Sequence, residues 1–452
     1  MNLKIKNIIL LALLVSAPVF SQQSWSLEEC IAHAIENNLA LNNQKYSTAS
    51  TKESYRQAVR NLLPGISGSS SYNISYGRSE DPNTGSVTDV DFFSNSYSIG
   101  SSIDLFRGFQ KLNTIKASKF LHKAVTEETL QQKYLLAFRV MSAYYDIRFN
   151  EGLVGNAKEQ LVISETNYAF VKKQIELGLK AEADLYEAES LLLTDKLALT
   201  TTENQLAAAK LLLIQEMNLE NETDITLIDS FDDGVSKSET QQMHTDSVYA
   251  ISHQFLPSIK AQALRVKVSK KDLAIARGSL YPSLSFSAGY GTGFYETNID
   301  PSTQETIDFK DQIKANASRS IGFSLNVPIS NKWNARSRVK QQKIALEQAE
   351  NNLNIQEQEL YKIIQQLVQE HHALATETEQ SAKKVTAQKM AFTIAQKKYE
   401  REMISALEMF RAKALYTSAI NENLQVKIRS RVNESTLAFY NGLPVFSINN
   451  NN

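Results

Sequence analysis

The chain has 452 residues, enough for two or three domains of ordinary size. Its 48 lysines and arginines nearly balance its 49 aspartates and glutamates, so no global positive charge points to a nucleic-acid partner. The single cysteine, Cys30, excludes an internal disulfide, and a chain almost without thiols suits an oxidising, exported setting. We expect Cys30 to be a small buried apolar residue near a helix start.

The first 21 residues have the pattern of a signal peptide. Lys4 and Lys6 precede an apolar stretch from residue 8 to 15, and Val19 and Ser21 are small enough for a signal-peptidase site. The apolar stretch is far shorter than the roughly 20 residues that a spanning helix needs. The sequence therefore predicts cleavage after residue 21 and export of the mature chain, and no cysteine follows at once to indicate a lipid anchor.

Four later segments alternate between apolar and small polar residues. They lie near residues 65–77, 92–105, 283–295 and 317–328, and each places aromatic or aliphatic residues opposite serine and glycine. Alternation of this kind predicts a β-strand whose two faces meet different surroundings. Each segment is about as long as the 9–11 tilted residues that cross a bilayer. Polar, acidic stretches between paired strands, at 78–91 and 296–312, indicate exposed loops.

Two interpretations fit the alternation. A soluble sandwich would bury the aromatic faces, but the two strand pairs are separated by helical segments far longer than sandwich connections. In an exported chain, lipid on one face and water on the other is the better interpretation, as in an outer-membrane β-barrel. Four strands cannot close a barrel, so neighbouring chains must supply the rest. The residues expected to face lipid are Tyr72, Tyr76, Phe93, Tyr97, Phe286, Tyr290, Phe294 and Phe323.

The helical segments carry a seven-residue period. Leucine recurs at positions 185, 192, 199, 206 and 213, and again at 346, 353, 360, 367 and 374. A sustained seven-residue period predicts left-handed supercoiling against neighbouring helices. No proline or glycine interrupts residues 335–399, so an unbroken helix there would be about 100 Å long. In the matching helix of the first half, we expect Gly152 and Gly155 to introduce a bend.

The two halves of the chain repeat each other. The segment "LLPGISGSSSYNISYG" at residue 62 resembles "LYPSLSFSAGYGTGFY" at 280, and "SIGSSIDL" at 98 resembles "SIGFSLNV" at 320. A repeat this long is a whole architectural unit rather than a solenoid repeat. It predicts a mainly helical protein with repeats at 22–219 and 248–442, each ending in a long helical hairpin. An acidic linker at 220–247 joins the repeats, and the polar tail at 443–452 is expected to be disordered.

The combination of paired strands, duplicated halves, heptad helices and the turn "LGLKAEADLYEAE" at residue 177 resembles the TolC family of outer-membrane efflux ducts. The resemblance covers essentially the whole mature chain. It implies a homotrimer with one shared twelve-stranded barrel in the bacterial outer membrane and an α-barrel of helical hairpins extending into the periplasm. It also implies a passive conduit of a tripartite efflux or type I secretion system, served by an inner-membrane pump and a periplasmic adaptor, with no catalysis and no cofactor.

The resemblance also places functional residues at the two hairpin turns, near 178 and 402. It implies that the adaptor docks on Leu177, Gly178 and Leu179 in the first turn and on Met403, Ile404 and Ser405 in the second. Glu402 departs from the glycine that the family often has, which bears on the geometry of the second contact. The simpler alternative is that glycine only ends a helix here, because it accepts the left-handed conformation.

Four residues near these turns are gate candidates. The resemblance implies that Asp184, Tyr399 and Glu408 help to close the inner end of the tunnel, and Arg411 could pair with a carboxylate there. Rings of carboxylates around a pore would favour cations. The alternative is an ordinary solvated helix face.

Two other classes of function remain as alternatives. The heptads would also suit a soluble periplasmic coiled-coil adaptor or scaffold, although two hairpins and two amphipathic strand pairs are more than such a protein needs. An envelope enzyme is favoured only by export, since no zinc-spaced cluster, P-loop, nucleophile elbow or dinucleotide fingerprint is present. The sequence therefore predicts neither an enzyme nor a metal site, and it does not identify the cargo.

Overall fold

The computed structural model describes residues 24–80, 85–89, 91–220, 222–228 and 244–446. The expected signal peptide, most of the acidic linker and the last six residues lie outside this part of the chain. The chain divides into two units. We call residues 46–128 and 258–356 the sheet unit, and the described residues of 1–45, 129–257 and 357–452 the hairpin unit.

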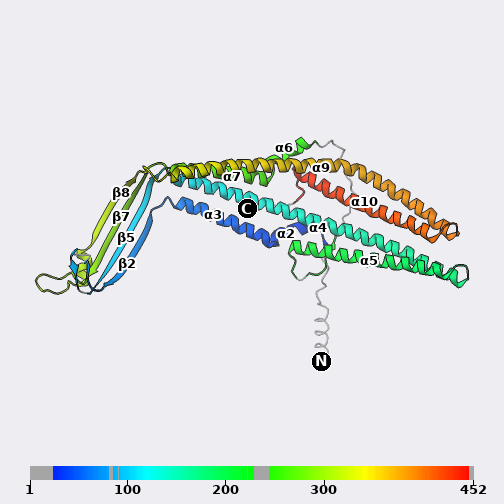
Figure 1. Ribbon diagram of the computed structural model, residues 1–452, viewed down its shortest axis with the longest axis horizontal. Coiled ribbons are helices and arrows are strands. Elements are labelled where there is room, and N and C mark those ends of the chain that lie inside the picture. The colour runs from blue at the N-terminus through cyan, green and yellow to red at the C-terminus, as the bar shows by residue number, and fades with distance from the viewer. Residues whose placement is uncertain (1–23, 81–84, 90, 221, 229–243, 447–452) are drawn as a thin grey trace, which may run out of the picture. The chain divides into compact units, whose positions relative to one another are not determined.

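The sheet unit contains one four-stranded antiparallel sheet in the order β2-β5-β7-β8, whose strands lie side by side in Figure 1. Its strands are β2 (Gly65–Ser75), β5 (Phe92–Arg107), β7 (Ser283–Tyr295) and β8 (Ser318–Asn326). β2 and β8 are edge strands, each paired on one side only within the described chain. The short strands β3 (Ser79–Glu80) and β4 (Val87–Thr88) pair with each other.

The register of the sheet confirms the two-faced pattern. On one face the hydroxyls of Ser69 and Ser98 lie 2.7 Å apart across β2 and β5. On the other face Phe286 lies opposite Phe323, with ring centroids 5.1 Å apart. A bulge between Asp104 and Phe106 shifts the register, so that Phe106 rather than Leu105 lies opposite Leu284 on the apolar face.

Two of the residues expected to face lipid are placed differently. Phe294 is only 8% exposed, because Phe93 and Phe309 pack on it with centroids 5.1 and 5.6 Å away. The prediction that Phe294 faces lipid is therefore wrong in the described chain, since α8 (Phe309–Ala315) covers this end of β7. Tyr76 is exposed but lies one residue beyond the end of β2. Tyr72, Tyr97, Tyr290 and Phe323 are exposed, and Phe93 and Phe286 are half-buried.

Two amide side chains extend the pairing of β7 beyond the point where β8 begins. The fully buried Gln312 accepts a hydrogen bond from the Tyr295 N–H at 3.0 Å and donates to the Tyr295 carbonyl at 2.9 Å. Asn316 donates to the Gly293 carbonyl at 2.8 Å. These amides replace the missing strand, so the backbone at this end of β7 stays hydrogen-bonded.

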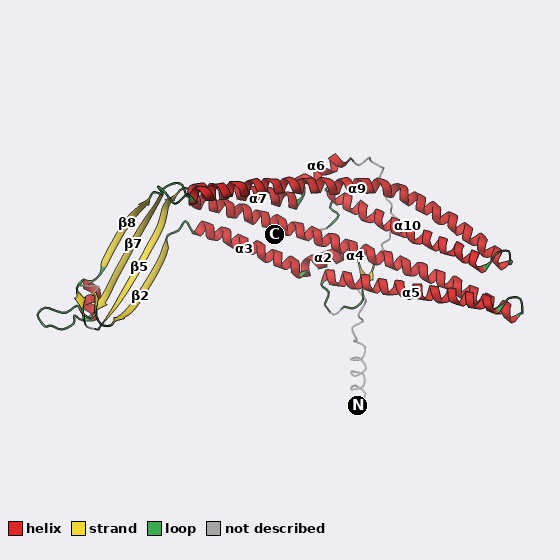
Figure 2. Cartoon of the chain, viewed as in Figure 1, coloured by secondary structure: helices red, strands yellow, loops and turns green. Residues whose placement is uncertain are grey.

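Four long helices form two hairpins, seen in Figure 2 as paired red helices that each end in a short turn. The first hairpin is α4 (Gln110–Glu176) and α5 (Glu182–Met217), and the second is α9 (Asn334–Glu400) and α10 (Ala406–Tyr440). Every heptad leucine is at least half-buried. α4 runs unbroken through Gly152, where a Cβ atom would lie 2.5 Å from Leu424. Gly152 therefore permits close packing of α4 and α10.

Shorter elements complete the helical part of the chain. The shorter helices are α2 (Leu27–Asn37), α3 (Leu39–Arg60), α6 (Thr245–Phe255) and α7 (Pro257–Gly278). Two short strands, β1 (Ser24–Trp25) and β6 (Thr226–Leu227), form a parallel pair. Among the described residues, every helix is too short or too polar to span a bilayer.

An aromatic cluster in the hairpin unit corrects the prediction for the tail. Phe446 is buried, with its ring centroid 5.0 Å from Phe138 and 5.8 Å from Phe439. The start of the tail therefore packs, because this phenylalanine leaves water. Cys30 is fully buried as predicted, and burial raises the pKa of its thiol to about 12.

Candidate functional site

The first candidate site residues lie at the turn between α4 and α5. Gly178 has a φ of +73°, its N–H donates to the Ile175 carbonyl at 2.9 Å, and the Leu179 N–H donates to the Gln174 carbonyl at 2.9 Å. This is a Schellman motif, in which a left-handed residue ends the helix and satisfies its last carbonyls. Leu177 and Leu179 project into solvent on either side of the glycine.

The second turn has the same geometry without a glycine. Glu402 has a φ of +58°, its N–H donates to the Tyr399 carbonyl at 2.9 Å, and the Met403 N–H donates to the Lys398 carbonyl at 2.9 Å. The departure at Glu402 therefore leaves the backbone of the turn unchanged. The left-handed conformation costs a non-glycine residue on the order of 1 kcal/mol, which the packing around the turn must offset.

Both turns present exposed apolar side chains. Met403 is exposed and Ile404 is half-buried, while Ser405 serves as the N-cap of α10. Leu407, the second residue of α10, is also exposed, and the sequence analysis did not single it out. Together Leu177, Leu179, Met403 and Leu407 make each hairpin end more apolar than an ordinary solvated turn, which is a feature of protein-binding surfaces.

Two of the gate candidates have a capping role. Glu408 and Ser405 form a capping box, in which the Ser405 N–H donates to Glu408 at 3.1 Å and the Glu408 N–H donates to the Ser405 hydroxyl at 3.3 Å. Asp184 accepts a hydrogen bond from the Ala181 N–H at 3.3 Å, at the matching position of α5. Both carboxylates therefore stabilise helix starts, whatever else they do.

The other two gate candidates, Tyr399 and Arg411, have different surroundings. Tyr399 is buried in a core cluster with Phe392 and Met409, and its hydroxyl accepts a hydrogen bond from the Lys180 ammonium at 3.0 Å. This contact joins the first turn to the end of α9. Arg411 is exposed, and within the described residues it pairs with neither Asp184 nor Glu408.

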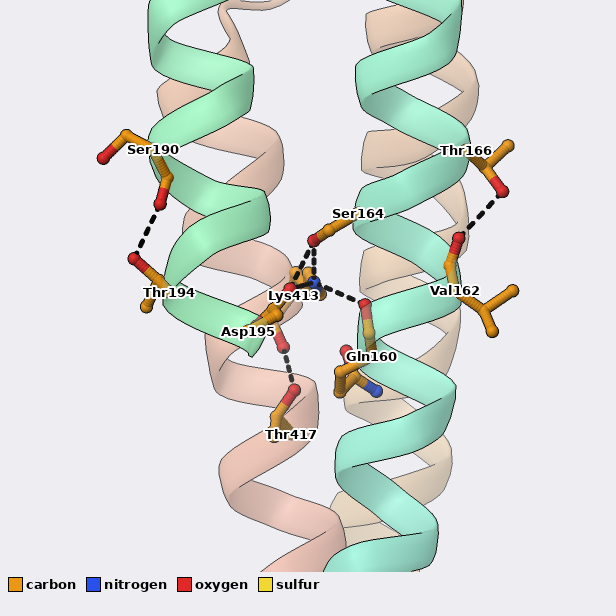
Figure 3. Close-up of polar contacts among 9 residues, drawn as sticks. All are labelled: Gln160, Val162, Ser164, Thr166, Ser190, Thr194, Asp195, Lys413 and Thr417. Carbon is orange, nitrogen blue, oxygen red and sulfur yellow. Dashed lines mark hydrogen bonds and ion pairs between the residues drawn. The ribbon is translucent and has the colours of Figure 1, made fainter. Parts of the chain in front are cut away.

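Sequence reasoning missed a buried polar network that joins three helices (Figure 3). Lys413 of α10 is 5% exposed, and its ammonium donates to the Gln160 carbonyl at 3.0 Å and the Ser164 hydroxyl at 2.6 Å, both on α4. It also forms an ion pair with Asp195 of α5, to which the Ser164 hydroxyl donates as well. One lysine thus ties the second hairpin to both helices of the first.

Burial dominates the electrostatics of this network. Desolvation lowers the pKa of Lys413, while the hydrogen bond and charge of Asp195 act in the opposite direction. The side-chain amide of Gln160 is buried beside it, and neither its nitrogen nor its oxygen has a partner in the described chain. The only signal in the sequence is Ser164, which interrupts the apolar seam of α4.

No group of three or more histidine, cysteine, aspartate or glutamate side chains among the described residues could hold a metal ion. The candidate functional features are therefore a two-faced sheet with unpaired edge strands, two hairpin turns of the same geometry, and the buried polar network around Lys413 that joins the hairpins.

Comparisons with known proteins agree with this architecture. A family model described as "Outer membrane efflux protein" matches residues 30–218 and 253–443, one segment in each half. Two relatives, both from strains of Pseudomonas putida, are each 23% identical over 274 residues: the probable efflux pump outer membrane protein SepC and the toluene efflux pump outer membrane protein TtgF. The aligned region is 60% of this chain and 55% of each relative, so it spans about half the relatives' length.

Solved structures show the same fold over nearly the whole chain. CusC, whose structures concern folding and transmembrane channel formation, matches with a TM-score of 0.79 at 17% identity, covering 94% of this chain and 96% of that one. The outer membrane protein VceC from Vibrio cholerae matches with a TM-score of 0.75 at 15% identity, covering 92% and 96%. Because the family model covers most of both halves, the chain belongs to the outer membrane efflux protein family.

Proposed function

We propose that this chain forms the outer-membrane exit duct of an efflux or type I secretion assembly and acts as a passive conduit. The observation that carries the proposal is the four-stranded sheet, which has an apolar, aromatic face, a serine and glycine face, and open edges at β2 and β8. Open edges are not tolerated in hydrocarbon, so copies must pair edge to edge until a barrel closes. Three copies would give twelve strands, with the serine and glycine face toward water.

The hairpin turns are the proposed docking surface for a periplasmic adaptor protein. The exposed Leu177, Leu179 and Met403 support this role, because they surround backbone turns held rigidly by hydrogen bonds. A backbone that is already fixed before docking loses little conformational entropy when a partner binds. An inner-membrane pump would then deliver substrates, directly or through the adaptor.

For the inner end of the duct we propose a gate built from Asp184, Glu408 and Arg411. The two carboxylates occupy equivalent positions after the two turns, and the exposed guanidinium of Arg411 is available to a neighbouring copy. The burial of Tyr399 supports a role in holding the two turns together through Lys180, rather than lining the pore.

Paired substitutions on the two faces of β7 test the proposal. Phe286→Asp places a carboxylate on the apolar face. Arginine or lysine at the bilayer midplane costs about 2–4 kcal/mol and a carboxylate somewhat less, so assembly into the outer membrane should be impaired. Ser287→Asp, its neighbour on the other face, should assemble and change the cation preference of single channels in planar bilayers. Equal behaviour of the two variants, or a soluble monomeric mature protein, would contradict the proposal.

Site-specific cross-linking tests the docking surface. Leu177→Cys and Leu197→Cys both replace an exposed leucine on the first hairpin, one at the turn and one in the middle of α5. A thiol-reactive cross-linker in cells should capture the adaptor from position 177 and not from 197. Capture from both positions, or from 197 alone, would remove the turn as the docking surface.

A further inference from the structure

The junction between β8 and α9 has an unusual backbone. Lys332 and Trp333 both have left-handed conformations, with φ of +55° and +66°. The matching junction before α4 has the same pair of conformations at Gly108 and Phe109, with φ of +56° and +59°. Each non-glycine residue in this conformation costs on the order of 1 kcal/mol. Both junctions thereby hold an aromatic ring in solvent: Trp333 is 67% exposed and Phe109 is 61% exposed.

The surroundings of Trp333 combine apolar surface with positive charge. Ile329 is 94% exposed, and a hollow of about 360 Å³ lies beside it, with Leu280 and Pro328 in its wall. The guanidinium carbon of Arg336 lies 4.4 Å from the Trp333 ring centroid, within the range of a cation–π contact. A hollow of mixed polar and apolar lining, with the exposed apolar side chains of Ile329 and Trp333 and a cation at its rim, matches an amphiphile whose polar end is anionic.

The positive charge at this junction is not neutralised from within the chain. Lys332, Arg336 and Arg338 are exposed, and none of them forms an ion pair in the part of the chain that the structure describes. Three cations within seven residues repel one another and gain from an external anion.

The duplicated half provides an internal comparison. There Asp104 forms ion pairs with Arg107 at 3.4 Å and with Lys111 at 3.1 Å. In the alignment of "SIGSSIDL" with "SIGFSLNV", the place of Asp104 is taken by Asn326. The second half therefore keeps the backbone and the exposed ring of the first but lacks the acid that balances its cations.

We propose that Trp333 and Arg336, with Lys332 next to them in the sequence, bind the phosphate headgroup region of a phospholipid at the periplasmic face of the outer membrane. This inference rests on the proposed outer-membrane duct. The cations would hold the phosphate, while the indole ring and Ile329 contact the apolar part of the lipid. A second copy fits less well as the occupant, because the edge strand β2 that would pair with β8 contains no acidic residue.

Tryptophan fluorescence provides the test, because Trp25→Phe leaves Trp333 as the only tryptophan of the full chain. The protein in maltoside micelles is titrated with phosphatidylglycerol brominated near the headgroup end of its chains. We expect saturable quenching of Trp333, and Arg336→Gln should require about tenfold more lipid, since a charge-assisted hydrogen bond of about 1.4 kcal/mol is lost. Lys397→Gln, the matched loss of an exposed cation far along α9, should leave the titration unchanged.

Three results would overturn the inference. Equal quenching by brominated diacylglycerol, which has the same chains without phosphate, would show that the headgroup is not recognised. Displacement by glycerol 3-phosphate at the same concentration as lipid would assign the site to a soluble phosphate. Shielding of Trp333 from acrylamide in the lipid-free protein would show that a second copy covers it. Channel currents of the same proteins test the duct separately, because quenching in micelles does not require conduction.

Discussion

The buried network around Lys413 predicts unequal effects for its two charged partners. Asp195→Asn would leave the Lys413 ammonium with only neutral acceptors, whereas Lys413→Met would leave the Asp195 carboxylate with the Ser164 hydroxyl. The Lys413 side chain is 6% exposed and that of Asp195 is 18% exposed, so water can solvate the orphaned carboxylate more readily than the orphaned ammonium. The double variant Asp195→Leu with Lys413→Met removes both charges.

The magnitudes follow from this difference in burial. Removing one partner of a buried ion pair costs about 3–5 kcal/mol, so we expect Asp195→Asn to lower the local stability of α10 by about 3 kcal/mol. Lys413→Met should cost about 1–2 kcal/mol, because the remaining carboxylate keeps one hydrogen bond and some water. The double variant should lie within about 1 kcal/mol of the parent, because well-packed apolar replacements of buried pairs are often neutral.

Hydrogen exchange followed by mass spectrometry measures these changes in local stability in the full chain. A loss of about 3 kcal/mol corresponds to roughly a hundredfold loss of protection in peptides around residue 413. Because burial lowers the pKa of Lys413, the unfolded chain binds its proton more tightly than the folded chain. Stability from this group therefore rises with pH, between the lowered folded value and the ordinary value of 10.5.

The pH dependence separates the two variants. Without Asp195 the pKa of Lys413 should fall further, so the defect of Asp195→Asn should be smaller near pH 9 than at pH 7, after correction for intrinsic exchange. The defect of Lys413→Met should instead grow with pH, because the parent gains stability as Lys413 loses its proton and the variant has no such group. Equal defects with the same pH profile would refute the view that an under-solvated lysine ties the hairpins together.

Three further sets of substitutions have defined outcomes in the same exchange experiment. Glu402→Gly should relieve a left-handed glutamate and raise protection of the second turn about fivefold, whereas Gly178→Ala should lower it at the first turn by a similar factor; opposite signs would contradict the strain argument. Gly152→Val should overpack the contact with Leu424 and cost about 1–3 kcal/mol, and Leu424→Ala in the same chain should restore part of the loss. Gln312→Ala should expose the backbone at the end of β7, cost about 1–3 kcal/mol and raise exchange there without affecting the hairpins.

Periodic patterns in the sequence predicted the elements of the fold. Serine and glycine alternate with apolar residues because each strand has two different faces, and the structure pairs Ser69 with Ser98 and Phe286 with Phe323 as that pattern requires. The leucine heptads likewise predicted which side of α5 and of α9 is buried. Such patterns predict structure well because they depend only on the regular backbone repeat of a strand or a helix.

Contacts between segments far apart in the chain could not be predicted in this way. Phe294 fits the apolar face of β7 by alternation, yet α8 covers it, and no periodicity encodes where a short connecting helix packs. Lys413 has the composition of a solvated helix face, and its burial depends on Asp195, which lies 218 residues earlier. The capping roles of Asp184 and Glu408 depend on residues close to them in the sequence and could have been predicted. The resemblance to known ducts instead suggested a gating role for their charge.

Comparison of the two halves shows where the backbone conformation is kept while the side chains differ. At both hairpin turns and at both strand-to-helix junctions the backbone is the same in the two halves, although glycine at positions 178 and 108 has become glutamate and lysine. A left-handed conformation that persists without glycine must be imposed by the surrounding packing, because the residue itself disfavours it. The side chains at these places are then free to diverge. It is at these fixed backbones with changed side chains, the second turn and the Trp333 junction, that we expect the two halves to bind different partners.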